Sequence, residues 1–97
     1  MATFSEIIQG DTQVLVDFHA DWCGPCKVMA PILNDLKAKL GEKVIILKVD
    51  VDKNRQAAAQ YQIQAVPTLL LFKKGQITWR KSGIVQKQIL EELFINQ

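Results

Sequence analysis

The sequence predicts an α/β domain in which helices cover both faces of a central mixed sheet. Short strands rich in Val, Ile and Phe alternate with segments of helical periodicity through the first 61 residues. Two later strand-like segments, 68–72 and 77–81, are separated by only four residues, Lys-Lys-Gly-Gln. Apolar residues make up 48% of the 97 residues, enough for one core in a chain too short for a second domain. We therefore expect residues 1–97 to form a single domain.

The first part of the chain alternates between helices and strands. Residues 3–9 fit a short helix in which Thr3 begins a capping box. Residues 14–19 are apolar on both faces, which is typical of a central strand buried under helices. Residues 23–40 predict a helix with one buried face, which ends at Gly41. The apolar side chains assigned to that face are Val28, Met29, Ile32, Leu33, Leu36 and Leu40.

The remaining segments change the direction of the strands. Residues 43–49 predict a second β-branched strand, and the alanine-rich segment 54–61 predicts a short helix. This order favours parallel strands joined by a right-handed crossover. The segments 68–72 and 77–81 are close enough to form an antiparallel hairpin. A final amphipathic helix is indicated by Val85, Ile89, Leu90, Leu93 and Phe94.

Charge and hydropathy exclude several classes of partner. The formal net charge is +2, and the 12 basic and 10 acidic residues are interspersed, so no basic stripe favours nucleic acid or lipid headgroups. The N-terminal residues lack the charged start and apolar stretch of a secretory signal, and no segment has the roughly 18 apolar residues of a membrane span. We expect a cytoplasmic protein with no nucleic-acid or membrane partner. A mature form whose signal had been removed would have the same sequence.

Cys23 and Cys26, separated by Gly24 and Pro25, are the chain's two cysteines. Such a pair fits either half of a zinc site or a redox couple. A closed zinc site needs two further Cys or His ligands, and only His19 is available, so we expect no metal site. So short a disulfide loop constrains the unfolded chain very little. Redox chemistry is therefore the favoured interpretation.

The position of the pair supports this interpretation. It lies between a buried strand and the first turn of a long helix, where free N–H groups and the helix dipole favour an anion. Cys23 is therefore expected to be the exposed nucleophilic thiolate. Cys26, one turn deeper on the same face, can attack the sulfur of Cys23 in a mixed disulfide. Pro25 suits the start of a helix, and Gly24 leaves the approach open.

Asp17 is a carboxylate in the middle of an otherwise apolar strand. Burial there disfavours the charged form and is expected to raise the pKa of Asp17. His19, two residues later, points to the same side of the strand. A lone histidine at a strand end is either a packed side chain or a group that tunes the pKa of a thiol.

Two segments resemble the thioredoxin family. Residues 16–27, Val-Asp-Phe-His-Ala-Asp-Trp-Cys-Gly-Pro-Cys-Lys, are similar to the active-site segment of that family. Residues 66–72, Val-Pro-Thr-Leu-Leu-Leu-Phe, are similar to its second hallmark, and the similarity extends from about residue 14 to the C-terminus. His19 departs from the pattern, because many members have Trp there. Few residues precede the active site, so we expect four strands, without the family's N-terminal edge strand.

The resemblance implies a protein-disulfide reductase in which Cys23 attacks and Cys26 resolves the mixed disulfide. It further implies a monomer with no bound cofactor that serves electron transport and cell redox homeostasis. Its partners are disulfide-containing proteins and a flavin-containing thioredoxin reductase, which supplies electrons from NADPH.

The resemblance also assigns roles to other residues. Asp17, accompanied by Lys48, is implied to assist proton transfer at Cys26, and Pro67 is implied to be cis and to pack against the disulfide. Trp22 is implied to cover the site, with its indole N–H near Asp52. The implied substrate rim consists of Trp22, Gly24, Pro25, Val66, Pro67, Gly83 and Ile84. Without the resemblance, Pro67 is an ordinary proline at a strand start, and Asp17 with Lys48 is a buried pair.

Two other functions stay open at this point. A thioredoxin-like binding module or subunit would use the groove without redox turnover, although the presence of both cysteines weighs against it. A disulfide isomerase or oxidant would share the fold, but such relatives often carry His between the cysteines, whereas this chain has Gly-Pro. The sequence specifies neither the substrate proteins nor the reduction potential.

Overall fold

A four-stranded sheet forms the centre of the computed structural model, which describes residues 1–95. The strand order is β2-β1-β3-β4. The strand β1 (Gln13–His19) pairs in parallel with β2 (Val44–Asp50) and antiparallel with β3 (Thr68–Lys73). The strand β4 (Gln76–Ser82) completes an antiparallel hairpin with β3. The structure confirms the mixed sheet, the four strands and the central place of the first strand.

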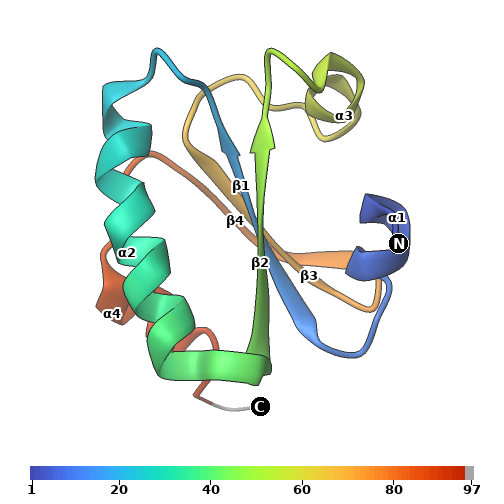
Figure 1. The fold of residues 1–97 in the computed structure, drawn as a ribbon, viewed down its shortest axis with the longest axis vertical. Helices are drawn as coiled ribbons and strands as arrows, with labels where there is room; N and C mark the ends of the chain where they lie inside the picture. The colour runs from blue at the N-terminus through green and yellow to red at the C-terminus, as the bar shows by residue number, and fades with distance from the viewer. Residues whose placement is uncertain (96–97) are drawn as a thin grey trace.

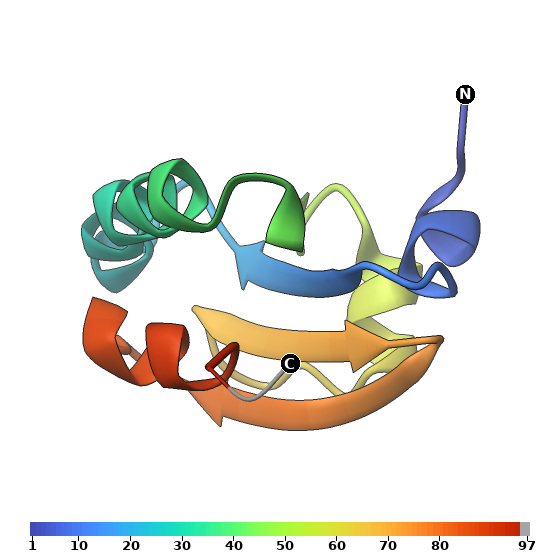
Figure 2. The same ribbon diagram turned by 90° about the horizontal axis from the view of Figure 1, so that it is seen from below.

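Helices lie on both faces of this sheet, as predicted. Figures 1 and 2 show α2 (Gly24–Leu40) and α4 (Lys87–Glu92) on one face, with α1 (Phe4–Ile8) and α3 (Arg55–Gln60) on the other. A short 3-10 turn, η1 (Gly41–Lys43), connects α2 to β2. Among the described residues, none of the helices combines the length and the apolar character that crossing a bilayer requires.

Alternating side chains of the sheet fill two apolar layers. The layer under α2 and α4 contains Leu15, Met29, Leu33, Leu36, Val44, Leu69, Leu71, Val85, Leu90 and Phe94. The layer under α1 and α3 contains Ile8, Val14, Val16, Phe18, Leu70 and Phe72. Because side chains alternate along a strand, Asp17 points to the same face as Leu15, toward α2. The alternation of side chains along β1 therefore places the carboxyl group of Asp17 beneath α2.

The ends of most elements follow the predicted boundaries closely, but α4 spans only Lys87–Glu92, so Val85, Leu93 and Phe94 lie outside the helix predicted from them. The capping box of α1 is present: Glu6 N–H donates to Thr3 Oγ1 at 3.2 Å, and Thr3 N–H donates to Glu6 Oε1 at 3.1 Å. Cys23, however, precedes α2 as its N-cap and is not the first residue of the helix. This position leaves the Cys23 side chain free to accept a hydrogen bond from the first turn.

Two residues assigned to buried helix faces are instead largely exposed. Val28 is 48% exposed and Ile89 is 45% exposed. In α2 the buried stripe consists of Cys26, Met29, Leu33 and Leu36, and Val28 lies on its flank, facing solvent. The assignment of Val28 and Ile89 to the core is therefore wrong, because hydrophobic spacing defines a stripe but not how far its neighbours cover it.

The different burial of Leu33 and Val28 on the same helix predicts different effects of their truncation on stability. Leu33→Ala is expected to lower the free energy of unfolding by about 2–5 kcal/mol, because Leu33 is 1% exposed and its truncation leaves a cavity. Val28→Ala is the matched control, with an expected change of about 0.5 kcal/mol or less. Urea denaturation followed by circular dichroism gives both values, and equal losses would contradict this division of the helix.

Candidate active site

The carboxyl ends of β1 and β2 lie at the same end of the molecule as the N-terminus of α2 (Figure 1), where Cys23 is the N-cap and Cys26 lies in the first turn. Cys23 and Cys26 form a disulfide, with 5.3 Å between their Cα atoms. The ends of the two strands are tied together beyond the sheet, because Val51 N–H donates to the carbonyl of His19 at 2.9 Å. The redox pair is thus anchored by the central strand, its parallel neighbour and the long helix.

The N-terminus of α2 is directed at the sulfur of Cys23. The backbone N–H of Cys26 donates to Cys23 Sγ at 3.1 Å, and Cys23 is the N-cap of a 17-residue helix. In the reduced protein, a Cys23 thiolate at this place would accept the same N–H group and lie at the positive end of the helix dipole. This arrangement lowers the free energy of the anionic sulfur relative to the thiol.

The burial of the two cysteines differs from the sequence expectation. Cys23 is 3% exposed and Cys26 is 7% exposed, so Cys23 is not the more exposed of the two in the disulfide form. Both belong to a small apolar cluster with Ala20, against which Val51 and Val66 pack. Cys26 also lines a pocket, which explains its slightly larger exposure. The distinction between the sulfurs therefore rests on the helix terminus and not on exposure.

A pocket of about 220 Å³ lies beside Cys26 on the α2 face of the sheet. It is lined by Asp17, His19, Ala20, Asp21, Cys26, Lys27, Ala30 and Lys48. Asp17 and Lys48 are opposite each other in the register of the parallel strands β1 and β2. Cys26, Asp17 and Lys48 thus line one pocket. Lys48 is exposed and forms no ion pair with Asp17 within the described residues, so the two are not the buried pair that the sequence also allowed.

Asp17 is buried without full hydrogen bonding. The residue is 2% exposed, and its Oδ1 has no hydrogen-bond partner within residues 1–95. Burial raises the pKa of Asp17 above its ordinary value, while the nearby His19 and Lys48 act in the opposite direction. The direction agrees with the sequence expectation. A carboxyl group that holds its proton at higher pH is suited to exchanging protons with a thiol.

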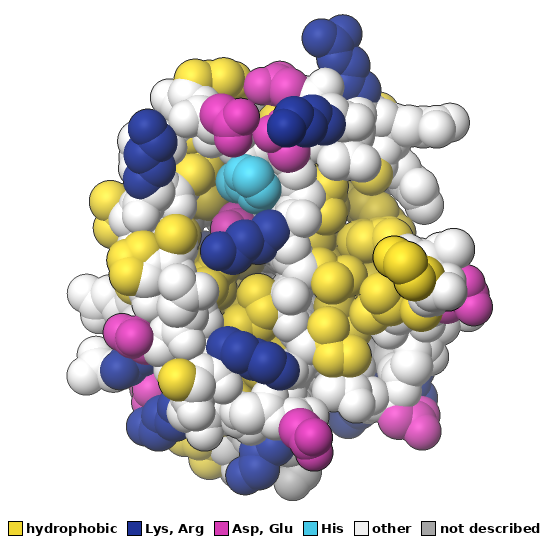
Figure 3. Space-filling view, in the orientation of Figure 1, with side chains coloured by type: hydrophobic (Ala, Val, Ile, Leu, Met, Phe, Trp, Pro, Cys, Tyr) yellow, Lys and Arg dark blue, Asp and Glu magenta, His cyan; other side chains and the backbone are white. Residues whose placement is uncertain are grey.

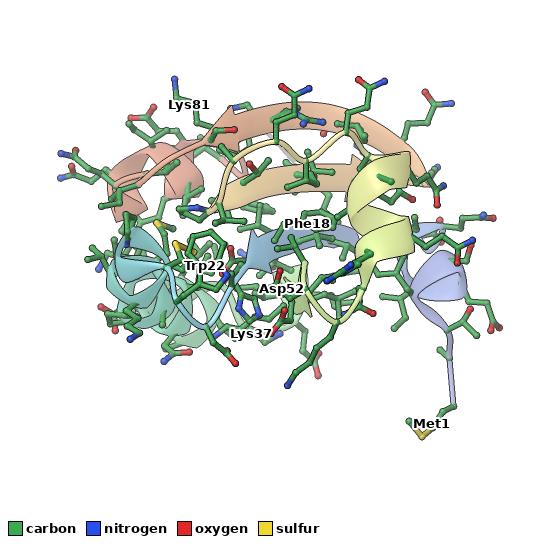
Figure 4. The ribbon with its side chains drawn as sticks, turned by 90° about the horizontal axis from the view of Figure 1, so that it is seen from above. Met1, Phe18, Trp22, Lys37, Asp52 and Lys81 are labelled. Carbon is green, nitrogen blue, oxygen red and sulfur yellow. A yellow bond between two sulfur atoms is a disulfide. The ribbon has the colours of Figure 1, made fainter. Side chains whose placement is uncertain are left out.

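Trp22 lies at the surface beside Asp52 (Figure 4). The indole Nε1–H donates to Asp52 Oδ2 at 2.9 Å, which confirms the predicted contact. The loop after β1 is thereby joined to the turn after β2. Because Trp22 is 72% exposed, most of its ring is available to another molecule.

The remaining rim residues come from two loops that are hydrogen-bonded to each other. The Val66-Pro67 peptide bond is cis, as implied, and Val66 packs against the cysteine cluster. Gly83 N–H donates to the carbonyl of Pro67 at 2.8 Å, and Gly83 has φ of 91°, a conformation that favours glycine. Ile84 is 50% exposed beside it. The two loops therefore form one continuous edge.

Gly24 and Pro25 are exposed at the start of α2. A Cβ atom added at Gly24 would meet no atom within 4 Å, so the approach at this position is open, as the sequence predicted.

Sequence reasoning did not identify Ala20 and Val51 as neighbours of the disulfide. Both residues follow directly after paired strands, β1 and β2. Parallel strands end at the same edge of a sheet, so the residues that follow them lie together. That rule, applied to the predicted parallel pair, could have placed both residues against the cysteines.

A disulfide of two closely spaced cysteines at a helix N-terminus, beside a buried carboxyl group, defines the class of thiol-disulfide oxidoreductases. Comparison with known proteins agrees with this class. Residues 1–96 match the family model described as Thioredoxin. A thioredoxin-like protein of Synechocystis sp. is 47% identical over 94 residues, which cover 95% of this chain and 90% of that protein.

Several relatives bear the name thioredoxin itself, and two of them illustrate the match. The thioredoxin of Bacillus subtilis is 45% identical over 80 residues, covering 82% of this chain and 77% of its own length. The thioredoxin of Haemophilus influenzae is 43% identical over 93 residues, covering 96% and 86%. The chain belongs to the thioredoxin family. It is a thiol-disulfide oxidoreductase of the protein-disulfide reductase type.

The buried state of Asp17 predicts a pH-dependent loss of stability. Because the pKa of Asp17 is raised in the folded protein, the folded state binds the proton more tightly than the unfolded state. The protonated carboxyl group therefore stabilises the folded protein at low pH. This stabilisation is lost as the pH rises from 3.8, the ordinary pKa of an aspartate, through the pKa of Asp17 in the folded protein, and it stays lost at higher pH. Asp17→Asn removes this loss, so we expect it to raise the free energy of unfolding at pH 7 by about 1–3 kcal/mol.

Urea denaturation between about pH 4 and pH 8 in buffer with EDTA measures this effect. Asp35→Asn, an exposed carboxylate on α2, is the matched control. The difference between Asp17→Asn and the wild type should grow with pH, and that for Asp35→Asn should not. A constant difference across this range would contradict the assignment.

Proposed function

We propose that Cys23 is the attacking thiolate and Cys26 the resolving thiol in the reduction of protein disulfides. The observation that carries this assignment is the 3.1 Å hydrogen bond from Cys26 N–H to Cys23 Sγ at the N-terminus of α2. This donor and the helix dipole favour the thiolate of Cys23. Cys26, inside the first turn, has no corresponding hydrogen bond to its sulfur among those described.

The reaction proceeds through two exchanges. The Cys23 thiolate attacks one sulfur of the substrate disulfide, forms a mixed disulfide and releases the other substrate sulfur as a thiolate. Cys26, after loss of its proton, then attacks the sulfur of Cys23 and releases the second substrate thiolate. The substrate gains two electrons, and the protein is left with the Cys23-Cys26 disulfide seen in the structure.

Asp17 and Lys48 are proposed as the proton partners of Cys26. Support comes from the pocket that all three line, and from the burial that raises the pKa of Asp17. A carboxylate there can accept the proton that Cys26 must lose before it attacks. Lys48, opposite Asp17 in the strand register, stabilises the negative charge when Asp17 is ionised.

The exposed apolar edge around the disulfide is proposed as the substrate groove. Trp22 and Ile84 offer exposed apolar surface, and Val66 joins this surface to the cysteine cluster. Gly24 and Pro25 leave the first turn of α2 open to an approaching chain. An extended segment of the substrate would lie along the edge built from Pro67 and Gly83, with backbone hydrogen bonds to Val66.

The electron supply and the location are also part of this proposal. A flavin-containing thioredoxin reductase would restore the dithiol with electrons from NADPH, with no cofactor bound to the protein itself. The protein would act as a monomer in electron transport and cell redox homeostasis. The cytoplasm is the proposed compartment, because a dithiol that reduces other proteins acts where thiols are kept reduced.

Serine variants separate the roles of the two cysteines. With NADPH, thioredoxin reductase and insulin, the wild type should consume NADPH, while Cys23→Ser and Cys26→Ser should both fall to the background rate. Cys26→Ser should in addition accumulate a mixed disulfide with the substrate, visible as an added mass on non-reducing gels, because Cys23 can attack but nothing resolves the product.

Each alternative gives a different pattern. A binding module would keep substrate binding in both serine variants and show no turnover in the wild type. An oxidant or isomerase would show a strongly oxidising potential and no insulin reduction. A mixed disulfide that accumulates in Cys23→Ser and not in Cys26→Ser would reverse the assigned roles.

Asp17→Asn tests the proton partner. We expect the second exchange to slow by about tenfold or more near neutral pH, because the amide cannot accept the proton of Cys26. Stopped-flow tryptophan fluorescence measures the rate from about pH 6 to pH 9, and Asp35→Asn serves as control. Rates equal to those of the wild type over this range would refute the role of Asp17.

A further inference from the structure

Three potential metal ligands converge at the surface next to the redox site. His19 ends β1, Asp50 ends β2, and Asp21 lies in the loop before α2. One ligand atom from each of these residues lies within 4.8 Å of the other two. Figure 3 shows the chain's single histidine at the surface, with acidic side chains next to it and basic side chains close by. His19 and Asp50 are also opposite each other in the parallel register, so the backbone holds them together.

The negative charge of this cluster is not balanced by an ion pair. Within residues 1–95 the ion pair present is Lys39–Glu91, which involves neither Asp21 nor Asp50, and Lys27 and Lys48 line the adjoining pocket without pairing with them. One oxygen of Asp50, Oδ1, accepts from the N–H groups of Asp52 and Lys53, which fixes the carboxylate. Its second oxygen remains available to a ligand.

An independent observation comes from the pocket that His19 and Asp21 line. Asp17 lines the same pocket, and the residue is 2% exposed. Its Oδ1 has no hydrogen-bond partner among the described residues. A buried oxygen without a partner costs free energy unless a ligand or a water molecule satisfies it. The pocket beside the cluster thus contains an acceptor that lacks a donor.

We propose that His19, Asp21 and Asp50 bind a divalent transition-metal ion of the zinc type. One imidazole nitrogen and two carboxylate oxygens suit such ions, whereas magnesium and calcium prefer oxygen ligands alone. Three protein ligands leave an open position for water, on a cluster that shares two of its residues with the pocket of the unsatisfied Asp17 oxygen.

The spacing of the ligands is close to what the ion needs. Tetrahedral zinc with bonds of about 2.1 Å holds its ligand atoms about 3.4 Å apart. Asp21 is exposed and lies in a loop, so rotation of its side chain can close the remaining difference from 4.8 Å. The expectation of no metal site concerned a closed site built with the cysteines. The proposed site uses no sulfur, and it does not depend on the redox function.

The experiment uses the oxidised protein, because Cys23 and Cys26 are then joined and cannot act as thiolate ligands. Isothermal titration with ZnCl₂ is expected to give one saturable site per chain. His19→Ala and Asp21→Asn should each weaken zinc binding by about tenfold or more. Asp35→Asn, an exposed carboxylate outside the cluster, should leave it unchanged. Magnesium in large excess should not displace the zinc.

Proton NMR gives a readout on the proposed ligand itself. The chain has one histidine, so the imidazole signals belong to His19 without further assignment. Zinc should shift these signals with the same saturation point as the titration, and Co²⁺ should broaden or shift them strongly. Asp21 is exposed, so Asp21→Asn keeps the test valid if His19→Ala unfolds.

The outcomes divide cleanly. Saturable one-to-one binding that shifts the His19 signals and weakens in the variants supports the site. Absence of saturable zinc binding, or binding that leaves the His19 signals and both variants unchanged, overturns it. Either result leaves the insulin assay unaffected as a test of the reductase function.

Discussion

The parallel pairing of β1 with β2 fixes the positions of the cysteines and of the charged residues beside them. Parallel strands end at the same edge of the sheet, and the crossover helix α2 begins just beyond that edge. The cysteines therefore lie at a helix N-terminus directly above the strand that contains Asp17. The same register places Lys48 opposite Asp17 and Asp50 opposite His19. A shift of one residue would turn Asp17 toward α1 and α3, away from Cys26.

The alternation of side chains along β1 determines the surroundings of Asp17 and therefore its pKa. Leu15 on the same face belongs to the core under α2, and Val16 and Phe18 belong to the core on the other side. The carboxyl group is buried because its neighbours must be buried, and that burial raises its pKa. Burial of this carboxyl group lowers the free energy of unfolding at neutral pH, and such a cost is consistent with the proposed role of Asp17 as proton acceptor for Cys26.

Much of the fold could be predicted from local patterns. The alternation of strands and helices, the hairpin and the capping box of α1 each depend on residues close in sequence, and the structure has all of them. The exposure of Val28 and Ile89 could not be predicted, because coverage depends on neighbouring elements. The burial of Cys23 under the cluster with Ala20, Val51 and Val66 likewise depends on segments brought together only by the fold. The carboxylates near His19 lie about 30 residues apart along the chain, so spacing alone did not associate them.

Lys48 also affects the edge of the sheet, because it belongs to the edge strand β2. This strand is at the edge of the sheet, and most of its other residues are apolar and at least half-buried. An edge strand of this composition exposes unpaired backbone groups on which another chain could add a strand. Lys48 is the exposed residue of β2, and its ammonium group would have to lose bound water if another strand paired along this edge. The lysine whose charge opposes the raised pKa of Asp17 therefore also disfavours the pairing of another chain with this open edge of the sheet.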